Sequence, residues 1–109
     1  MKVKVVRPSR WDHPGAFPTF EKGTPVIMST YEDEGFLGWY SCDIEGFKTY
    51  VPKVFISNGE LLRSYNPTEL IQCEGDILEV LEIVNAWLLV ANDRKVTGWI
   101  PAETVISIT

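Results

Sequence analysis

The chain has 109 residues, of which 45% are hydrophobic and 23% are charged, and its formal net charge is −5. This composition is typical of a globular protein and excludes an intrinsically disordered one. No apolar run approaches the roughly 20 residues of a membrane-spanning helix, and the N-terminal segment lacks the apolar stretch of a signal peptide.

The acidic excess lies in the second half of the chain. Residues 1–58 hold seven basic and seven acidic side chains, whereas residues 59–109 hold three basic and eight acidic ones. Recognition of phosphate groups needs clustered lysine and arginine, so we expect no nucleic-acid partner. The basic residues near the N-terminus fit a solvated strand edge, where lysine discourages aggregation.

Short runs rich in Val, Ile, Tyr and Trp, separated by Gly, Pro and Asn, predict an all-β fold. In chain order, the first candidate strands are residues 3–7, 25–30, 38–44, 48–52 and 54–57. A second set follows at residues 61–63, 77–84, 87–91, 97–101 and 105–108. Asn58-Gly59 lies between the two sets and is a strong hairpin signal. We therefore expect the last strand of the first set to run directly into the second set.

The two sets repeat the same order of residues. The corresponding positions are Gly23 and Gly75, Trp39 and Trp87, and Pro52 and Pro101. Tryptophan and proline are 13 positions apart in the first set and 14 in the second. A conserved order with variable loop lengths predicts a duplication, with one domain at residues 1–58 and the other at residues 59–109.

Residues 61–106 resemble a Src-homology-3 (SH3) domain. The similarity rests on Leu61-Leu62-Arg63-Ser64-Tyr65 at the family's opening Ala-Leu-Tyr-Asp-Tyr segment, on residues 69–78 at its Glu-Leu-Ser-Phe-x-x-Gly-Asp segment, on Trp87, and on Gly98-Trp99-Ile100-Pro101 with Val105. Residues 1–57 are similar through Gly23, Trp39, Pro52 and Phe55. The resemblance implies two small five-stranded SH3-like barrels in tandem, closely fused. Arg63 and Thr104 stand where the family has tyrosines.

The same resemblance implies a non-enzymatic protein-interaction module for extended or proline-containing peptides. The expected ligand-binding residues are Trp39, Tyr50, Pro52 and Phe55 in the first barrel, and Tyr65, Trp87 and Pro101 in the second. In such a groove the tryptophan lies at the surface, and its indole N–H donates to the peptide backbone. The acidic run Glu32, Asp33, Glu34 is either a specificity loop for a basic partner or a solvated loop tip.

Two other functions remain open. Residues 22–26 and 32–40 are similar to an Agenet or Tudor-type domain, a small barrel whose aromatic cage binds methylated lysine or arginine. Such a cage works because the faces of aromatic rings attract a cation. The other alternative is a structural or oligomerisation protein, in which the groove is buried between barrels or in a homodimer.

The sequence predicts no catalytic, metal or cofactor site. His13 is the only histidine and has no evident nucleophile and acid beside it. A zinc site needs four ligands, and Cys42 and Cys73 stand apart at no recognised spacing. Two reduced cysteines favour a cytoplasmic protein. We expect a protein or peptide partner, without nucleic acid, membrane or cofactor, and homo-oligomerisation stays open.

Overall fold

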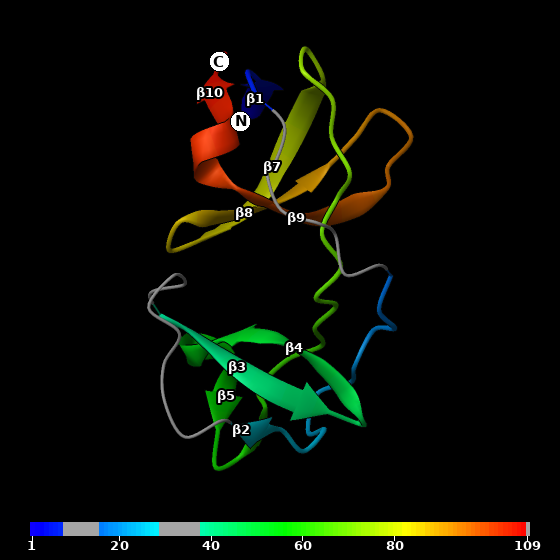
Figure 1. The fold of residues 1–109 in the computed structure, drawn as a ribbon, viewed down its shortest axis with the longest axis vertical. Helices are drawn as coiled ribbons and strands as arrows, with labels where there is room; N and C mark the ends of the chain where they lie inside the picture. The colour runs from blue at the N-terminus through cyan, green and yellow to red at the C-terminus, as the bar shows by residue number, and fades with distance from the viewer. Residues whose placement is uncertain (8–15, 29–37, 109) are drawn as a thin grey trace. The chain divides into compact units, whose positions relative to one another are not determined.

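The computed structural model describes residues 1–7, 16–28 and 38–108. Their secondary structure consists of strands and short 3-10 helices, which confirms the predicted all-β class. None of the helices in these residues is long and apolar enough to cross a bilayer. The chain divides into two compact units, unit 1 (Met1–Ala16 and Thr68–Thr109) and unit 2 (Phe17–Pro67), which are shown in Figure 1.

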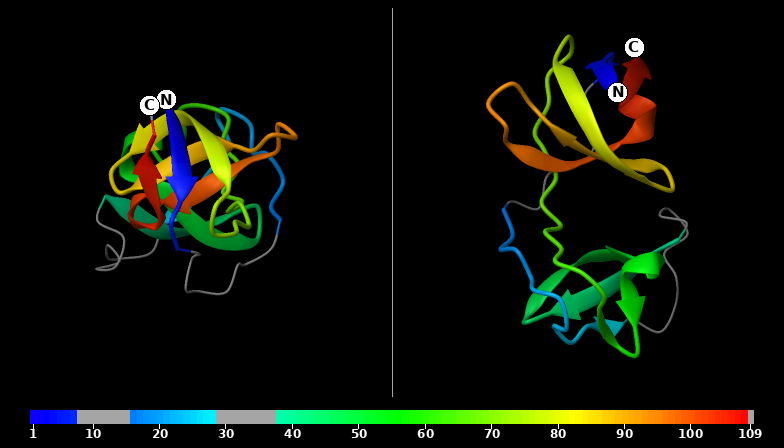
Figure 2. Two further views of the ribbon diagram at one scale, coloured as in Figure 1. Left: turned by 90° about the horizontal axis from the view of Figure 1, so that it is seen from above. Right: turned by 180° about the vertical axis from the view of Figure 1, so that it is seen from behind.

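Unit 1 contains a five-stranded antiparallel sheet in the order β10-β1-β7-β8-β9. Its elements are β1 (Lys2–Val5), β7 (Ile77–Val84), β8 (Trp87–Ala91), β9 (Thr97–Pro101), the 3-10 helix η2 (Ala102–Thr104) and β10 (Val105–Ser107). The N-terminal strand β1 lies between β10 and β7, so both ends of the chain meet in one sheet (Figure 2).

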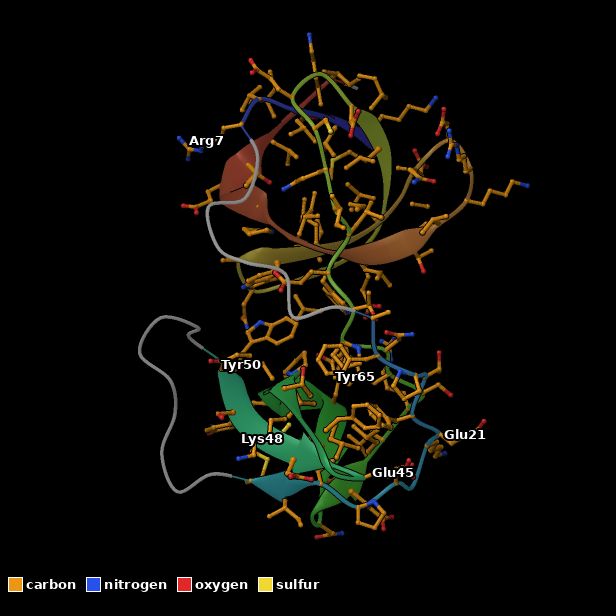
Figure 3. The ribbon with its side chains drawn as sticks, turned by 45° about the vertical axis from the view of Figure 1, so that its right-hand side comes forward. Arg7, Glu21, Glu45, Lys48, Tyr50 and Tyr65 are labelled. Carbon is orange, nitrogen blue, oxygen red and sulfur yellow. The ribbon has the colours of Figure 1, made fainter. Side chains whose placement is uncertain are left out.

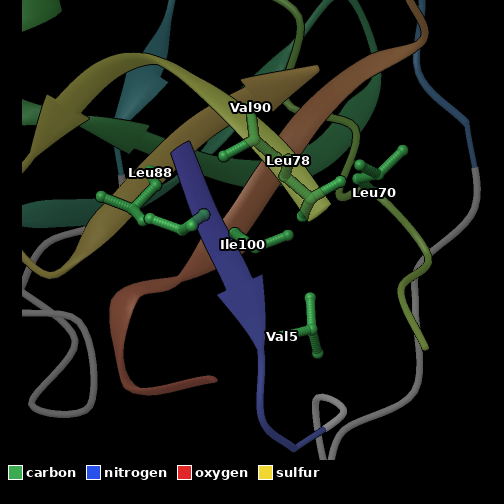
Figure 4. Close-up of a cluster of buried hydrophobic side chains, with 7 residues drawn as sticks. Val5, Leu70, Leu78, Leu88, Val90 and Ile100 are labelled. Atoms are coloured by element: carbon green, nitrogen blue, oxygen red, sulfur yellow. The ribbon is translucent and has the colours of Figure 1, made fainter. Parts of the chain in front are cut away.

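Unit 1 has a cluster of buried apolar side chains at its core. Along β1, Val3 and Val5 are buried while Lys2 and Lys4 are exposed, which is the two-residue alternation of a strand with one face on the core. The cluster they join consists of Val3, Val5, Leu70, Leu78, Leu88, Val90 and Ile100 (Figure 4). Leu70 comes from the segment before β7, which a parallel bridge between Glu69 and Trp99 holds against β9.

Unit 2 contains a three-stranded sheet, β2-β3-β4, and a two-stranded hairpin, β5-β6. Its elements are β2 (Ile27–Met28), β3 (Trp39–Ile44), β4 (Phe47–Pro52), the 3-10 helix η1 (Lys53–Phe55), β5 (Ile56–Ser57) and β6 (Glu60–Leu61). Asn58 and Gly59 have φ angles of 53° and 76° between β5 and β6. Such a turn favours Asn-Gly, and the predicted hairpin is confirmed.

This division differs from the predicted domains at residues 1–58 and 59–109. The Asn58-Gly59 hairpin lies inside unit 2 instead of joining two barrels, and β1 pairs with β7 and β10 instead of with unit 2. Charge gives one physical reason. Lys2 stands opposite Glu79, and the α-amino group of Met1 lies 3.6 Å from the Glu79 carboxylate. Opposite charges across a strand pair are favourable, so the basic arm complements the acidic second half.

The two units share a pattern of backbone hydrogen bonds. Three N–H groups of unit 2 donate to carbonyls in the same way as their counterparts in unit 1. In unit 2 the bonds run from Gly23 to Leu61, from Leu62 to Phe55 and from Lys53 to Gly38. In unit 1 the corresponding bonds run from Gly75 to Val5, from Val6 to Thr104 and from Ala102 to Ala86. These bonds place Leu61 of β6 where unit 1 has Val5 of β1. β6 therefore has the position in unit 2 that β1 has in unit 1.

Candidate functional site

Each unit brings its predicted tryptophan and proline together. Trp39 of β3 stands opposite Pro52 of β4, and Trp87 of β8 stands opposite Pro101 of β9. Both prolines end a strand and are followed by a 3-10 helix. Proline has no N–H with which to continue the ladder, so the chain turns at the same point in both units.

The two tryptophans are more buried than the sequence predicted. The exposed fraction is 4% for Trp39 and 9% for Trp87, and both prolines are buried as well. The prediction had both indole rings at the surface, so this is a correction. Burying a large aromatic ring removes much apolar area from water, which is favourable for folding.

Phe55 is the centre of an aromatic group in unit 2. The rings of Phe55 and Tyr65 meet edge to face, with centroids 5.5 Å apart. The Tyr65 hydroxyl donates to the carbonyl of Tyr50 over 2.6 Å, and Figure 3 labels both tyrosines. The predicted residues Phe55 and Tyr65 thus lie in one aromatic group, which the backbone of Tyr50 contacts through this hydrogen bond.

Tyr65 was predicted to line the second groove with Trp87 and Pro101, and the structure places it in unit 2. The backbones of Tyr65 and Phe20 exchange two hydrogen bonds, of 2.9 and 2.8 Å, which hold this tyrosine against Phe55. The family motif predicts a ligand-binding residue at Tyr65. It does not indicate to which unit the tyrosine belongs.

A cation already lies on the Phe55 ring. The guanidinium carbon of Arg63 is 4.4 Å from the ring centroid, in cation–π geometry. Phe55 is only 4% exposed, and both Arg63 and Tyr65 contact its ring. The tyrosine that the family has at this position is replaced by a residue that covers the aromatic surface.

A further aromatic group in unit 2 consists of Phe17, Phe20 and Phe47. The Phe47 ring lies edge to face with Phe17 and Phe20, at centroid distances of 6.1 and 5.8 Å. Phe47 is 41% exposed, whereas Phe20 is buried. The sequence gives no signal for a binding role of Phe47, because a single phenylalanine after a turn fits any strand.

Unit 1 has the polar residue Thr104 where unit 2 has Phe55. Thr104, the counterpart of Phe55, is buried; its hydroxyl donates to the Pro101 carbonyl over 2.7 Å and accepts a bond from Gln72 over 3.2 Å. The Oε1 atom of Gln72 is buried with no hydrogen-bond partner among the described residues. Unit 1 therefore has a hydrogen-bonded polar side chain at the place where unit 2 has an aromatic ring.

Four of the residues that the sequence singled out lie outside the part of the chain that the structure describes. These residues are Glu32, Asp33, Glu34 and His13.

Within the described ranges, no three His, Cys, Asp or Glu side chains gather as metal ligands would. Burial, with a smaller contribution from the charge of Asp43, raises the pKa of the Cys42 thiol to about 12. A thiol that stays protonated is a poor nucleophile.

The sequence model of the variant SH3 domain matches residues 61–108. No curated protein and no solved structure matches the chain. The match and the all-β structure support an SH3-like fold. Domains of this kind are typically non-catalytic and bind proteins or peptides, which supports that kind of partner for this chain. The match begins at Leu61, a residue that the structure places in β6 of unit 2.

Proposed function

We propose that the chain is a non-enzymatic protein-interaction module that binds an extended, proline-containing peptide at the Phe55 group of unit 2. On this proposal both units are small SH3-like barrels. The observation that carries it is the repeated arrangement, in which a tryptophan–proline pair, a 3-10 helix and a following strand recur with equivalent hydrogen bonds.

Unit 2 is the better candidate for the groove because it has more aromatic side chains at this place, although Phe55 and Tyr65 are both buried in the structure. Phe55 and Tyr65 pack together there, whereas unit 1 has Thr104 in the place of Phe55. Three exposed apolar side chains belong to the same stretch of chain: Tyr50, Val54 and Leu62. A peptide in polyproline conformation presents a preformed apolar face, for which aromatic side chains are the usual recognition surface.

Arg63 decides how accessible this surface is. A peptide that reaches the face of Phe55 has to displace the guanidinium, which lies 4.4 Å from the ring centroid. An exposed cation–π contact is worth about 0.5–1 kcal/mol, so the displacement lowers affinity without abolishing it. We expect weak binding by each unit, with a gain in avidity where one ligand engages both.

The Arg63 contact also favours a second function, the binding of a cationic or methylated side chain. A ring that holds the guanidinium of its own chain has the geometry to hold that of a ligand. A third function, a structural or oligomerisation role, is favoured by the burial of Trp39 and Trp87.

The test is an amide NMR titration of the labelled protein with proline-rich peptides and, separately, with methyl-lysine and methyl-arginine peptides. Saturable shifts at residues 50–65 with the proline-rich peptides alone support the leading proposal. Shifts with methylated peptides alone support the second function. An unchanged spectrum with every peptide rejects both and leaves the structural role.

Arg63→Gln provides a matched variant, because it removes the charge from Phe55 while keeping a polar, exposed side chain. Proline-rich peptides should bind this variant about twofold to fivefold more tightly, in line with the loss of a contact of about 0.5–1 kcal/mol. Lys53→Gln, an exposed basic residue of η1, is the control and should leave affinity unchanged. Equal affinities for all three proteins would show that Arg63 does not cover the binding surface.

A further inference from the structure

In each unit, one strand comes from the half of the sequence that otherwise forms the other unit. Read along the chain, residues 2–5 precede the unit 2 segment, yet they form β1 of unit 1. Residues 60–61 precede the unit 1 segment 68–109, yet they form β6 of unit 2. We call this observed pairing the exchanged arrangement.

The family match follows the other order. It runs without interruption from residue 61 to residue 108, so it assigns the segment at Leu61 to the same domain as β7 to β10. The structure builds that domain with β1 instead. In the structure, residues 2–5 form this strand of unit 1. In the family match, the segment that starts at Leu61 takes the same position.

From this we infer that the chain has a second, sequential arrangement, in which β6 moves into unit 1 and β1 moves into unit 2. The inference concerns the pairing of strands within one chain and needs no ligand. Where it touches binding it rests on the proposed function, because it changes what covers Phe55.

The two strands are chemically equivalent enough to replace each other. The shared hydrogen bonds make Val5 the counterpart of Leu61, so both strands bury an aliphatic side chain at this position, whereas the buried Val3 of β1 corresponds to Gly59. One and two positions further on, Val6 corresponds to Leu62 and Arg7 to Arg63, all four exposed. In the sequential arrangement Arg7 takes the place of Arg63 beside Phe55.

Other contacts hold the exchanged arrangement in place. Lys2 and the α-amino group of Met1 face Glu79, where the sequential arrangement would bring the uncharged Asn58. Tyr65 packs on Phe55 in unit 2, where Ser9 would follow the exchanged strand. These contacts make the exchanged arrangement the major one and the sequential one the minor state of a two-state equilibrium.

The rearrangement changes the proposed binding surface. When β6 leaves unit 2, Tyr65 moves with it and its edge-to-face contact with Phe55 is lost. Unit 1 then gains the tyrosine that the family motif places beside Trp87 and Pro101. The strand pairing thus decides which unit carries the complete aromatic groove.

Cysteine pairs can report the pairing directly, in a Cys73→Ser background that removes the exposed native thiol. Lys4 stands opposite Ile106 in the exchanged arrangement. Glu60 stands opposite Ser57, the counterpart of Ile106, so Glu60 would face Ile106 in the sequential arrangement. Opposed residues of antiparallel strands have Cα atoms about 4.5–5.5 Å apart, a distance that a disulfide spans.

The experiment compares three double variants under mild oxidation of the native protein. Lys4→Cys with Ile106→Cys reports the exchanged arrangement, and Glu60→Cys with Ile106→Cys the sequential one. Glu60→Cys with Arg94→Cys, which joins β6 to the β8–β9 loop, measures random encounters. Non-reducing electrophoresis separates monomers from dimers, and mass spectrometry of the peptides identifies each bond.

We expect the first pair to close rapidly, and the second to close within the monomer at least tenfold faster than the encounter control. Closure of the second pair no faster than the control would overturn the proposal. Closure of the second pair only between two molecules would also overturn it, in favour of strand exchange between copies. Failure of the first pair to close would overturn the exchanged arrangement itself.

The outcome is independent of whether the chain binds peptides, because the cross-links form without a ligand. Repeating the peptide titration on the two locked proteins separates the two proposals. If the wild type binds peptide but the sequential cross-link does not form, the proposed function is supported and the rearrangement is rejected. If the sequential cross-link forms but neither locked protein binds peptide, the rearrangement is supported and the proposed function is rejected.

Discussion

Gly98 of β9 lies so close to the backbone of Leu70 that a Cβ atom on Gly98 would come within 2.6 Å of the Leu70 nitrogen. The contact is built by two hydrogen bonds, from Leu70 N–H to the Trp99 carbonyl and from Trp99 N–H to the Thr68 carbonyl, of 3.1 and 3.0 Å. It holds Leu70 in the core of unit 1. Only glycine allows this approach between the segment before β7 and the sheet.

Gly98→Ala should therefore lower the free energy of unfolding of unit 1 by about 1–3 kcal/mol, the usual cost of overpacking a core. Urea unfolding followed by tryptophan fluorescence measures it. Thr97→Val, an exposed change on the same strand that keeps a β-branched side chain, is the control and should stay within about 0.5 kcal/mol of the wild type. An alanine variant as stable as the control would show that Leu70 can move away.

Gly23 and Gly75 should respond to substitution alike, because they occupy equivalent turns. Their φ angles are +90° and +95°, and a Cβ at either would meet no atom within 4 Å. Replacement by alanine thus costs backbone strain alone, about 1–2 kcal/mol in each unit. Asparagine tolerates positive φ better, so Gly75→Asn should cost less than Gly75→Ala in thermal unfolding. If Gly75→Asn and Gly75→Ala lower the unfolding temperature equally, the cause is not backbone strain.

The strands themselves could largely be predicted from the sequence. Residues 77–84, 87–91 and 97–101 were predicted as strands and form β7, β8 and β9 with the same bounds. Alternating apolar residues and flanking turn residues mark such strands locally. The prediction was less accurate where Lys53–Phe55 forms a 3-10 helix, since a proline followed by apolar residues fits a strand equally well.

The partners of the strands could not be predicted in the same way. The pattern of Val3 and Val5 shows which side of β1 faces a core, but two similar cores are available in one chain. Tyr65 was consequently predicted for the second barrel, whereas the structure places it in unit 2. The cover that Arg63 gives Phe55 depends on the same pairing, so the sequence showed the replaced tyrosine but not its effect.

Tyr65→Phe tests how firmly β6 is held in unit 2. The change removes the hydroxyl that donates to the Tyr50 carbonyl over 2.6 Å and keeps the ring against Phe55. We expect a loss of about 0.5–1.5 kcal/mol in the free energy of unfolding, the net value of one such hydrogen bond. Tyr40→Phe, a half-buried tyrosine on β3, is the control. If both variants unfold at the same urea concentration, the bond contributes nothing.

The buried thiol of Cys42 should make stability depend on pH in the alkaline range. Burial raises its pKa from 9.0 to about 12, so the folded state favours the protonated thiol. This contribution is fully present below pH 9 and is lost as pH rises towards the folded-state pKa. Cys42→Ala removes the titrating group. The wild type should therefore lose stability relative to this variant above pH 9, and parallel pH profiles would show that the thiol does not contribute.

Glu79 offers a way to loosen β1 without changing that strand. It faces Lys2 and lies 3.6 Å from the α-amino group of Met1, and these groups are about half exposed. Glu79→Lys replaces an attraction by a repulsion, and exposed pairs of this kind are worth up to about 1 kcal/mol. Amide hydrogen exchange of Val3 and Val5 should accelerate by about twofold to tenfold, because β1 leaves the sheet more often.

Glu103→Lys makes the same charge change on η2 and serves as the control for net charge. The difference between the two variants should shrink in 0.5 M salt, since exposed charges are screened over a few ångströms at that concentration. If the sequential arrangement exists, Glu79→Lys should also speed the Glu60–Ile106 cross-link, because Asn58 would replace the repelled Lys2. Faster exchange at β1 without a faster cross-link would mean that the strand detaches and returns without exchanging its place.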